Sequence, residues 1–501
     1  MAVTIYKGTT WIRVRCNMHG YIDETHDIGY FIKTRLRQRE WNPKFNCFTT
    51  TYNFSRFQAA EGYGYLPRYA LDPLLEYLND PTVKVEDVPP VEAQWSLGRT
   101  KMKPQFELRP HQHGLYEFLT EKDRSFAPLS AACGQGKTLV STAAAIAADG
   151  PILLVLGLLI DQWIKSFLTH TTLKREELYV CQGFESIKNL WEMLDNGFKP
   201  KLVIFSTRTL VLYAIDRPMP YNQIRTYQDL QKKIGFTTKI IDECHLNFYA
   251  NVQIDLCSNI ARNIYLSATY SRSDYQGKAI FDMVYPPEVR YGEELAEKYT
   301  SVLIGQYHLQ LAESVLSRFK REKGYLHALY EKYLLQHPKS YLKMFEDEIL
   351  IPLMDQFYFT IKKPGQRLLI LCKTRKFVEA LTAYLAPICK QHKANLSLYF
   401  AGERGKAGKQ ENLLADVIIS TTNSCSTGVD IKGLKTCINT VSFASEPLAA
   451  QTMGRLRKIP NEETIFIDLW NGEIPTHKYH IVARRNVYRR KALNVTEVLV
   501  R

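Results

Sequence analysis

A glycine-rich stretch around residue 134 carries the residue types of a phosphate-binding loop. Gly134, Gly136, Lys137 and Thr138 match the end of the P-loop pattern, whereas Ala131 stands in place of its first glycine. Glycines let backbone N–H groups surround phosphate oxygens, a lysine adds a positive charge, and a threonine hydroxyl can hold Mg²⁺. A strongly helical run follows and would direct its N-terminal dipole at the anion. The alternative is an ordinary glycine turn before a helix.

An acidic pair further along the chain suits hydrolysis of a phosphoanhydride. Asp242 and Glu243 follow an apolar run that predicts a strand. Asp242 can hold the Mg²⁺ that bridges nucleotide phosphates, and Glu243 can orient and deprotonate the attacking water. His245 would couple this pair to Ser267 and Thr269, whose small hydroxyl side chains after a strand suit a hinge that senses the nucleotide. Each pattern alone is common in loops, but their order indicates a nucleoside-triphosphatase.

Short apolar runs that alternate with helical stretches must position these side chains. Such alternation predicts parallel sheets flanked by helices, an α/β fold, once before residue 290 and again after residue 300. Residues 309–360 look largely helical and are expected to pack on the second sheet. The predicted strands are Ile152–Leu156, Leu202–Phe205, Lys239–Ile241, Asn263–Leu266, Arg367–Leu371, Leu396–Tyr399, Asp416–Ser420, Cys437–Ser442 and Thr464–Asp468.

These patterns divide the chain into four predicted regions. Residues 1–100, rich in aromatic side chains, are expected to form a small N-terminal α+β domain that binds nucleic acid, and Asp80–Glu92, with three prolines, indicates a linker. Residues 101–290 form the predicted nucleotide-binding domain. Residues 291–475 form a second domain with a helical insertion, and 476–501 form a basic C-terminal tail.

Composition narrows the class of protein. The 501-residue chain has a net charge of +14, which favours an anionic partner, with nucleic acid first. Its ten cysteines contain no CxxC pair, so neither a zinc site nor a disulfide framework is indicated, and a reducing cytoplasm is expected. The charged N-terminus lacks the apolar core of a signal peptide, and no apolar run has the length of a membrane span. We therefore expect a soluble, cytoplasmic protein with no membrane partner.

Basic and aromatic residues gather near both ends of the chain and predict contacts with a nucleic-acid backbone. A solvated charged face is the alternative at either end. Arg35, Arg37 and Arg39 would share one face of a strand, whereas they would spread around a helix. The residues concerned are Arg13, Arg15, Lys33, Arg35, Arg37, Arg39, Trp11, Tyr30 and Trp41 near the N-terminus, and Arg484, Arg485, Arg489, Arg490, Lys491, Tyr479 and Tyr488 near the C-terminus.

The motifs ACGQGKT, DECH, SAT, STGVDI and QTMGRLRK, in this order, resemble those of superfamily 2 helicases. More narrowly, they are similar to the branch that holds XPB-like helicases, the poxviral transcript-release helicase and the phage UvsW recombination helicases. The resemblance covers roughly residues 105–470. It implies two tandem RecA-like domains, ATP as the nucleotide, Mg²⁺ as the metal, and movement along nucleic acid.

The resemblance assigns further roles in the first domain. Arg109 and Gln112 lie in a segment similar to the adenine-reading Q motif. Gln162 falls in a segment similar to motif Ia, which touches the nucleic-acid backbone. Ser206 and Thr207 begin a segment similar to motif Ib and offer hydroxyls to phosphate. For the segments similar to motifs Ia and Ib, the alternative is that each is only the edge of a sheet with no contact to nucleic acid.

In the second domain, Lys373 and Arg375 resemble motif IV, where a strand ends in nucleic-acid contacts. Thr427, Gly428 and Asp430 resemble motif V. There the resemblance implies that Asp430 reaches the nucleotide sugar and that Thr427 contacts nucleic-acid phosphate.

QTMGRLRK resembles motif VI, in which arginines stabilise charge on the γ-phosphate. Gln451 and Arg455 fit its pattern as a coupling residue and a catalytic arginine. The second arginine of the pattern falls at Lys458, and Arg457 stands one residue early. Because lysine is a poor substitute for a forked guanidinium, either Arg457 or Lys458 remains open as the second finger.

Together these features predict an ATP-dependent DNA helicase or translocase, with 3′ to 5′ movement as in the families it resembles. Its expected substrates are single-stranded, forked or branched DNA, remodelled by unwinding or branch migration in phage recombination, repair or replication. A transcript-release or RNA helicase is one alternative, since phosphate contacts do not distinguish DNA from RNA. A non-catalytic DNA-binding or annealing protein is another. The sequence does not identify protein partners.

Overall fold

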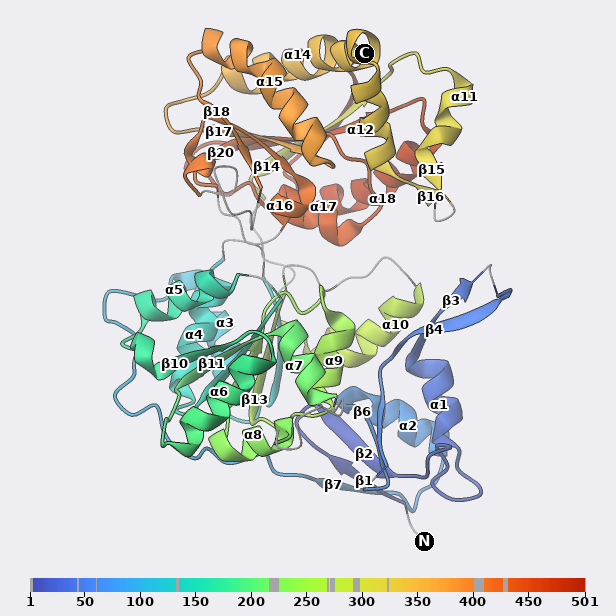
Figure 1. Ribbon diagram of the computed structural model, residues 1–501, viewed down its shortest axis with the longest axis vertical. Coiled ribbons are helices and arrows are strands. Elements are labelled where there is room, and N and C mark those ends of the chain that lie inside the picture. Colours follow the sequence, from blue (N-terminus) through green and yellow to red (C-terminus); the bar gives the residue numbers. More distant parts are fainter. Residues whose placement is uncertain are drawn as a thin grey trace. The chain divides into compact units, whose positions relative to one another are not determined.

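The computed structural model describes residues 3–42, 45–59, 61–131, 135–157, 159–215, 225–267, 270, 275–291, 298–321, 324–400, 410–426 and 431–500. The chain forms two compact units, Met1–Glu294 and Leu295–Arg501 (Figure 1). The first unit contains a mixed sheet and a parallel sheet, and the second contains another parallel sheet. This confirms the predicted α/β class with two parallel sheets and a small N-terminal α+β domain. None of the helices in the described ranges is both long and apolar enough to cross a membrane.

The N-terminal domain is a five-stranded sheet in the order β5-β6-β2-β1-β7. Helices α1 and α2 add Phe31 and Leu74 to a core shared with Ile12 and Leu66 of the sheet. Strand β7 pairs in parallel with β1, so the segment expected to be a linker supplies an edge strand. The elements are β1 Thr4–Lys7, β2 Trp11–Arg15, α1 Ile28–Arg35, β5 Arg56–Gln58, β6 Tyr63–Pro67, α2 Leu71–Leu78 and β7 Lys84–Asp87.

A separate hairpin of β3 (Arg37–Asn42) and β4 (Cys47–Asn53) leaves this domain after α1. Its backbone is held by Gln276 of α10, which donates to the carbonyl of Arg37 at 2.7 Å and accepts from the backbone N–H of Arg39 at 3.1 Å. Arg35 ends α1, whereas Arg37 and Arg39 lie in β3. The three arginines therefore do not share one element.

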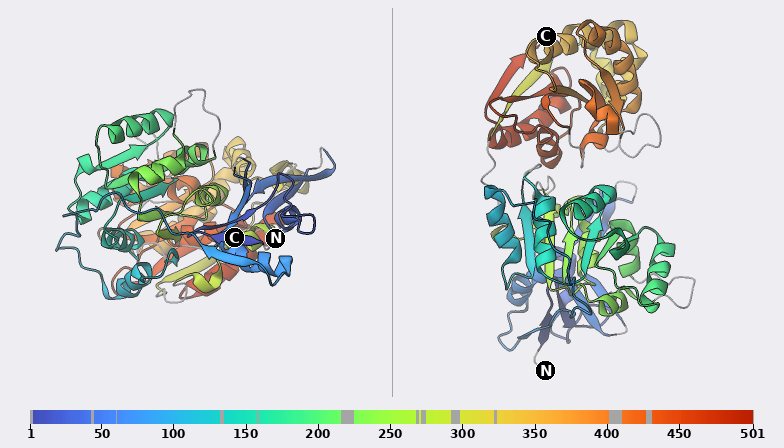
Figure 2. Two further views of the ribbon diagram at one scale, coloured as in Figure 1. Left: turned by 90° about the horizontal axis from the view of Figure 1, so that it is seen from below. Right: turned by 90° about the vertical axis from the view of Figure 1, so that its left-hand side faces the viewer.

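The parallel sheet of the first unit has the strand order β10-β11-β9-β12-β13-β8. Its strands are apolar runs buried on both faces, as parallel strands require: all five residues of β9, for example, are buried. Helices α3, α4 and α5 pack on one face, and α6 to α10 pack on the other (Figure 2). The strands are β8 Phe126–Ser130, β9 Ile152–Leu156, β10 Leu178–Cys181, β11 Leu202–Ser206, β12 Thr238–Ile241 and β13 Arg262–Ser267. The helices are α3 Pro110–Thr120, α4 Lys137–Ala147, α5 Ile160–His170, α6 Phe184–Asp195, α7 Thr207–Ala214, α8 Tyr227–Ile234, α9 Phe248–Asp255 and α10 Tyr275–Val284.

The second unit is built on a parallel sheet in the order β18-β19-β17-β20-β21-β14-β22. Helices α12 to α15 pack on one face, and α16 to α18 pack on the other. The strands are β14 Thr300–Tyr307, β17 Arg367–Cys372, β18 Leu396–Tyr399, β19 Val417–Thr421, β20 Leu434–Asn439, β21 Thr464–Asn471 and β22 Val495–Leu499. The helices are α11 Glu313–Leu316, α12 His327–Gln336, α13 Lys343–Phe345, α14 Ile351–Met354, α15 Arg375–Gln391, α16 Thr422–Ser426, α17 Glu446–Met453 and α18 Pro475–Lys491, and β15 Lys320–Arg321 and β16 Gly324–Tyr325 form a small hairpin.

The helical insertion expected over 309–360 is present, and its buried Phe345, Leu350 and Tyr358 belong to the core of the second unit. Wide π-helical turns at Pro338–Leu342 and Glu346–Leu350 interrupt its α-helices.

The segment 476–501 is not a tail. It forms most of α18 and the edge strand β22, which pairs with β14. Arg484 is fully buried, and its guanidinium bonds to both carboxylate oxygens of Asp468, at 2.7 and 3.2 Å. Tyr488 donates to the same carboxylate at 2.7 Å. These two residues, expected near nucleic acid, are instead part of the core, because a buried carboxylate needs several donors.

Replacement of Arg484 should therefore destabilise the second unit. Arg484→Ala leaves the Asp468 carboxylate buried without its cation, which costs about 3–5 kcal/mol. Arg489→Ala removes an exposed arginine from the same helix and should change the unfolding free energy by no more than about 0.5 kcal/mol. Equilibrium unfolding in urea measures both. Equal stability of the two variants would contradict the structural role of Arg484.

Candidate nucleotide site

The site is assembled by three neighbouring parallel strands of the first unit, β8, β13 and β12. Ser130 pairs with Ser267 at the ends of β8 and β13, and Tyr265 pairs with Ile241 of β12. Parallel strands present their carboxyl ends at the same edge of a sheet. The phosphate loop, Ser267 and Asp242 therefore meet at one edge, although the loop lies more than a hundred residues before the other two in the chain.

Gly136 lies in the left-handed region, with φ of +85°, at the start of α4. A Cβ atom here would overlap Nε2 of Gln112, so only glycine fits. The Gln112 side chain donates to the carbonyl of Gln135 at 3.0 Å and accepts from the backbone N–H of Arg109 at 2.9 Å. It thereby ties α3 to the phosphate loop, and base reading by Arg109 and Gln112 stays a prediction. Gly134 lies outside the described residues.

Lys137 and Thr138 form the first turn of α4. Nζ of Lys137 donates to the carbonyl of Ala131 at 2.6 Å, so the ammonium group lies at the end of β8. Within the described ranges, the hydroxyl of Thr138 makes no hydrogen bond, and the residue is half-buried. Phosphate binding by Lys137 and metal binding by Thr138 stay predictions.

Asp242 is half-buried directly after β12. Its Oδ2 accepts from the indole Nε1 of Trp163 at 2.8 Å, and its Oδ1 accepts from the backbone N–H of Glu243 at 3.0 Å. Burial, with a smaller contribution from the charge of Glu243, raises the pKa of Asp242 to about 6, while the indole bond and the charge of Lys137 oppose the shift. A half-buried carboxylate near Lys137 is short of positive charge, which a divalent cation supplies.

Glu243, His245 and Ser267 form a connected line. Nδ1 of His245 lies 3.5 Å from Oε2 of Glu243 and 2.8 Å from the hydroxyl of Ser267. Among the residues that the structure describes, Oε2 of Glu243 has no hydrogen-bond partner although it is buried, and the residue has a φ of +48°. An unpartnered buried oxygen in a strained backbone is typical of a functional group held for a reacting molecule. Thr269 lies outside the described residues.

These residues fit a nucleoside triphosphate with Mg²⁺. The glycine at position 136 permits close approach of phosphate, and the Thr138 hydroxyl and the Asp242 carboxylate supply oxygen ligands that suit Mg²⁺.

The residues of the first unit that are predicted to contact nucleic acid differ in exposure and in hydrogen bonding. Gln162 is exposed on α5, whereas its neighbour Trp163 turns inward to Asp242. The Ser206 hydroxyl caps α7 by accepting from the backbone N–H of Thr209 at 3.2 Å. Thr207 is only 4% exposed. Contact with phosphate stays a prediction for these residues. For Ser206, such a contact would compete with the hydrogen bond by which its hydroxyl caps α7.

In the second unit, Lys373 follows β17 and Arg375 begins α15. The backbone N–H groups of Lys373 and Thr374 donate to Glu331 of α12, at 2.5 and 2.7 Å. Burial raises the pKa of Glu331 to about 7. The Arg375 guanidinium lies 5.0 Å from the ring of Phe400. The backbone N–H of Lys373 is used by Glu331, whereas its side chain is exposed. A phosphate contact of Lys373 would therefore have to come from the side chain.

Gln451 lies on α17, and Arg455 follows that helix; each is 5% exposed. Arg457 is half-buried and donates to the carbonyl of Gly454 at 2.5 Å, whereas Lys458 is exposed. Thr427, Gly428 and Asp430 lie outside the described residues. The choice between Arg457 and Lys458 as a second finger stays open.

Trp163 and Glu331 were not predicted as site residues. A buried tryptophan needs an acceptor for its N–H, and the position of Trp163 in an amphipathic helix after a buried strand was the available signal. No local pattern marked Glu331, because its partners lie more than forty residues away.

No protein-family model and no curated protein matches the chain. Among solved structures, the ATP-dependent type ISP restriction-modification enzyme LlaBIII bound to DNA matches 80% of this chain and 32% of its own, with 15% identity and a TM-score of 0.50. UvsW of T4 is covered over 100% of both chains, with 14% identity and a TM-score of 0.37. Dbp5 of S. cerevisiae bound to RNA and ADP BeF3 matches 78% of this chain and 89% of its own, with 12% identity and a TM-score of 0.48.

At this identity, the likeness to LlaBIII shows the fold alone. The chain shares with it a fold of two parallel α/β lobes, which a small mixed-sheet domain precedes in this chain. Within that fold, the ends of β8, β12 and β13 carry the phosphate loop and the acidic pair.

Trp163→Phe should weaken the binding of Mg·ATP about tenfold, because a hydrogen bond to a charged carboxylate contributes about 1.5–3 kcal/mol. Loss of the indole donor also raises the pKa of Asp242 further above about 6. More of this carboxyl is then protonated near neutrality, so the loss should be larger at pH 6.5 than at pH 8.

Trp191→Phe is the matched control, since the indole of Trp191 donates to the Tyr213 hydroxyl at 3.0 Å, away from the site. Titration calorimetry at the two pH values measures the effect. Equal affinity of the two variants would contradict a role of Trp163 at the metal.

Proposed function

We propose that this protein is an ATP-dependent helicase or translocase that acts on DNA. The observation that carries the proposal is the convergence of Lys137, Asp242, Glu243 and His245 at one sheet edge of a RecA-like lobe. Such an arrangement matches the needs of phosphoanhydride hydrolysis: a cation for phosphate, a metal ligand, and a base held by a second group.

The chain's own residues divide the work. Backbone N–H groups at the start of α4 and the Lys137 ammonium bind the phosphates, with Gly134 and Gly136 permitting their close approach. Thr138 and Asp242 would hold Mg²⁺, which when bound would supply positive charge beside the phosphates. Glu243 takes a proton from the attacking water at its unpartnered Oε2, and His245 relays the change to Ser267 and Thr269.

We assign further roles to residues of both lobes. Arg455, with Arg457 or Lys458, stabilises the charge of the transition state. Arg109, Gln112, Gly428 and Asp430 bind the base and sugar, and Gln451 couples hydrolysis to movement. Gln162, Ser206, Thr207, Lys373, Arg375 and Thr427 contact the strand that is moved. The domains are proposed as 1–100, which binds nucleic acid, 101–290 and 291–475, with 476–501 completing the second lobe.

Charge supports a nucleic-acid substrate, because a net charge of +14 favours a polyanion. DNA is our choice, since LlaBIII, which shares the fold, is bound to DNA. We further propose 3′ to 5′ movement and the remodelling of forked or branched DNA in recombination, repair or replication of a phage, with work in the cytoplasm of its host.

The test is ATP hydrolysis without nucleic acid and with single-stranded DNA, forked DNA or RNA. Stimulation by DNA is expected, and Glu243→Gln should lower kcat at least about 100-fold, because the amide cannot accept the proton of the water. Glu185→Gln, an exposed change on α6, should leave kcat unchanged.

Stimulation by RNA alone would reassign the substrate. Turnover that survives both Glu243→Gln and Lys137→Ala would overturn the catalytic assignment. A fork that stays unremodelled during rapid ATP turnover would refute the proposed role.

A further inference from the structure

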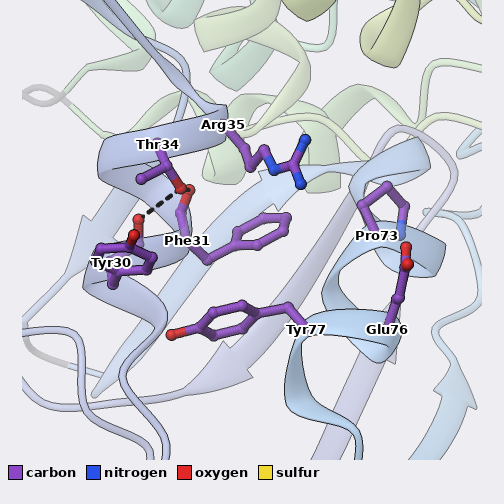
Figure 3. Close-up of a pocket in the computed structure, with 7 residues that line it drawn as sticks. All are labelled: Tyr30, Phe31, Thr34, Arg35, Pro73, Glu76 and Tyr77. Atoms are coloured by element: carbon purple, nitrogen blue, oxygen red, sulfur yellow. Dashed lines mark hydrogen bonds between the residues drawn. The ribbon is translucent and has the colours of Figure 1, made fainter.

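A pocket of about 470 Å³ opens between α1 and α2 of the N-terminal domain (Figure 3). Its volume is in the range of sites for small organic groups. No role predicted from the sequence involves α2. The lining residues are Tyr30, Phe31, Thr34, Arg35, Pro73, Glu76 and Tyr77.

Aromatic rings form one wall. Tyr30 and Tyr77 lie nearly parallel, with 21° between planes and centroids 6.4 Å apart, and Phe31 lies 5.6 Å from Tyr77. The Tyr77 hydroxyl donates to the backbone carbonyl of Asp27 at 2.8 Å, which fixes the ring between the two helices. Phe31 is buried, whereas Tyr30 is 58% and Tyr77 39% exposed. These are rigid aromatic faces open to solvent, which suit stacking of a planar group.

Charged groups stand at the rim. Figure 3 shows the Arg35 guanidinium and the Glu76 carboxylate around the space beside the Phe31 ring. Neither side chain has an ion-pair or hydrogen-bond partner among the described residues, and Arg35 is exposed. Other arginines of this domain have structural tasks: Arg68, for example, donates to the Thr9 carbonyl at 3.1 Å and the Ser125 hydroxyl at 2.6 Å.

The charge around the pocket is concentrated. Residues 28–59, which include α1 and the β3–β4 hairpin, contain six basic residues and one acidic residue. The other residues among the first hundred contain six basic and ten acidic residues. The hairpin also exposes Trp41, Phe48 and Tyr52. A basic, aromatic surface on an otherwise acidic domain favours a strand of nucleic acid over a neutral ligand.

We propose that this pocket binds one unstacked base of a single nucleic-acid strand. The base stacks on Tyr77 and Tyr30, its neighbouring phosphate pairs with Arg35, and Glu76 accepts from the exocyclic amino group of the base. The site would hold a strand on the N-terminal domain, apart from the strand contacts of the two lobes. The inference rests on the proposed function only in taking nucleic acid as the substrate.

The test measures equilibrium binding by the full chain without ATP. The probes are a 20-nucleotide oligodeoxycytidylate and a strand of equal length made of abasic sites. The variants are Tyr77→Leu, Tyr30→Ala and Arg35→Ala. Tyr77→Phe keeps the ring, and Arg99→Ala removes an exposed arginine elsewhere.

Stacking predicts that Tyr77→Leu and Tyr30→Ala weaken binding of the cytidylate about 5- to 100-fold and binding of the abasic strand less than twofold. Arg35→Ala should weaken both and reduce the slope of log affinity against log salt by about 0.7. The control variants should stay within about twofold of wild type. Tyr30→Ala changes a mostly exposed side chain, so it tests the pocket even where Tyr77→Leu unfolds the domain.

Equal losses on the abasic strand, or no loss in the Tyr30 and Tyr77 variants, would overturn the proposal. An oligocytidylate RNA identifies the source of the strand: tighter, base-dependent binding of RNA would support the pocket and assign it to RNA. Base-dependent binding without any DNA-stimulated ATP turnover would refute the proposed function, whereas it would support the proposed base-binding pocket.

Discussion

The register between β8, β13 and β12 is the constraint on which the site depends. Each of these strands supplies one functional loop, and only parallel pairing without slippage places the three loops side by side. A shift of one residue would turn every side chain of a strand to the other face and separate Asp242 from Lys137. Burial of these strands on both faces therefore fixes their register. The apolar core thus also positions the charged groups of the site.

Buried or half-buried carboxylates are the second recurring element. Asp242 is held by Trp163, Glu331 by two backbone N–H groups, and Asp468 by Arg484 and Tyr488. Asp468 is fully supplied with donors and stabilises the core. The donors to Asp242 among the described residues, an indole and a backbone N–H, are neutral, so its charge suits a divalent cation. The two aspartates thus differ both in the charge of their donors and in exposure, since Asp468 is fully buried and Asp242 is half-buried.

Local sequence patterns predicted most strands and the main site motifs. They failed where pairing between distant parts of the chain determines the structure. The predicted strands coincide with observed ones, because apolar runs of strand length need no distant information; β20, which lies at Leu434–Asn439 rather than 437–442, is displaced by its pairing with β17 and β21. The phosphate loop and acidic pair were recognisable from residue types alone. Segment 476–501 was misjudged because its charges suggest solvent, whereas Asp468 and β14, which draw it into the fold, lie far away in the chain.

The order of strands in the second lobe also bears on how this protein is made. Strand β14 is the first of its sheet in the chain, yet it lies between β21 and β22, the last two. A nascent lobe would carry the open edges of β14 until these final strands leave the ribosome, whereas the first lobe and the N-terminal domain already have all their partners. Unpaired edges invite association with other chains. The ribosome-bound intermediate of the second lobe is thus a natural client for chaperones, and a pause in translation before residue 464 would lengthen its exposure.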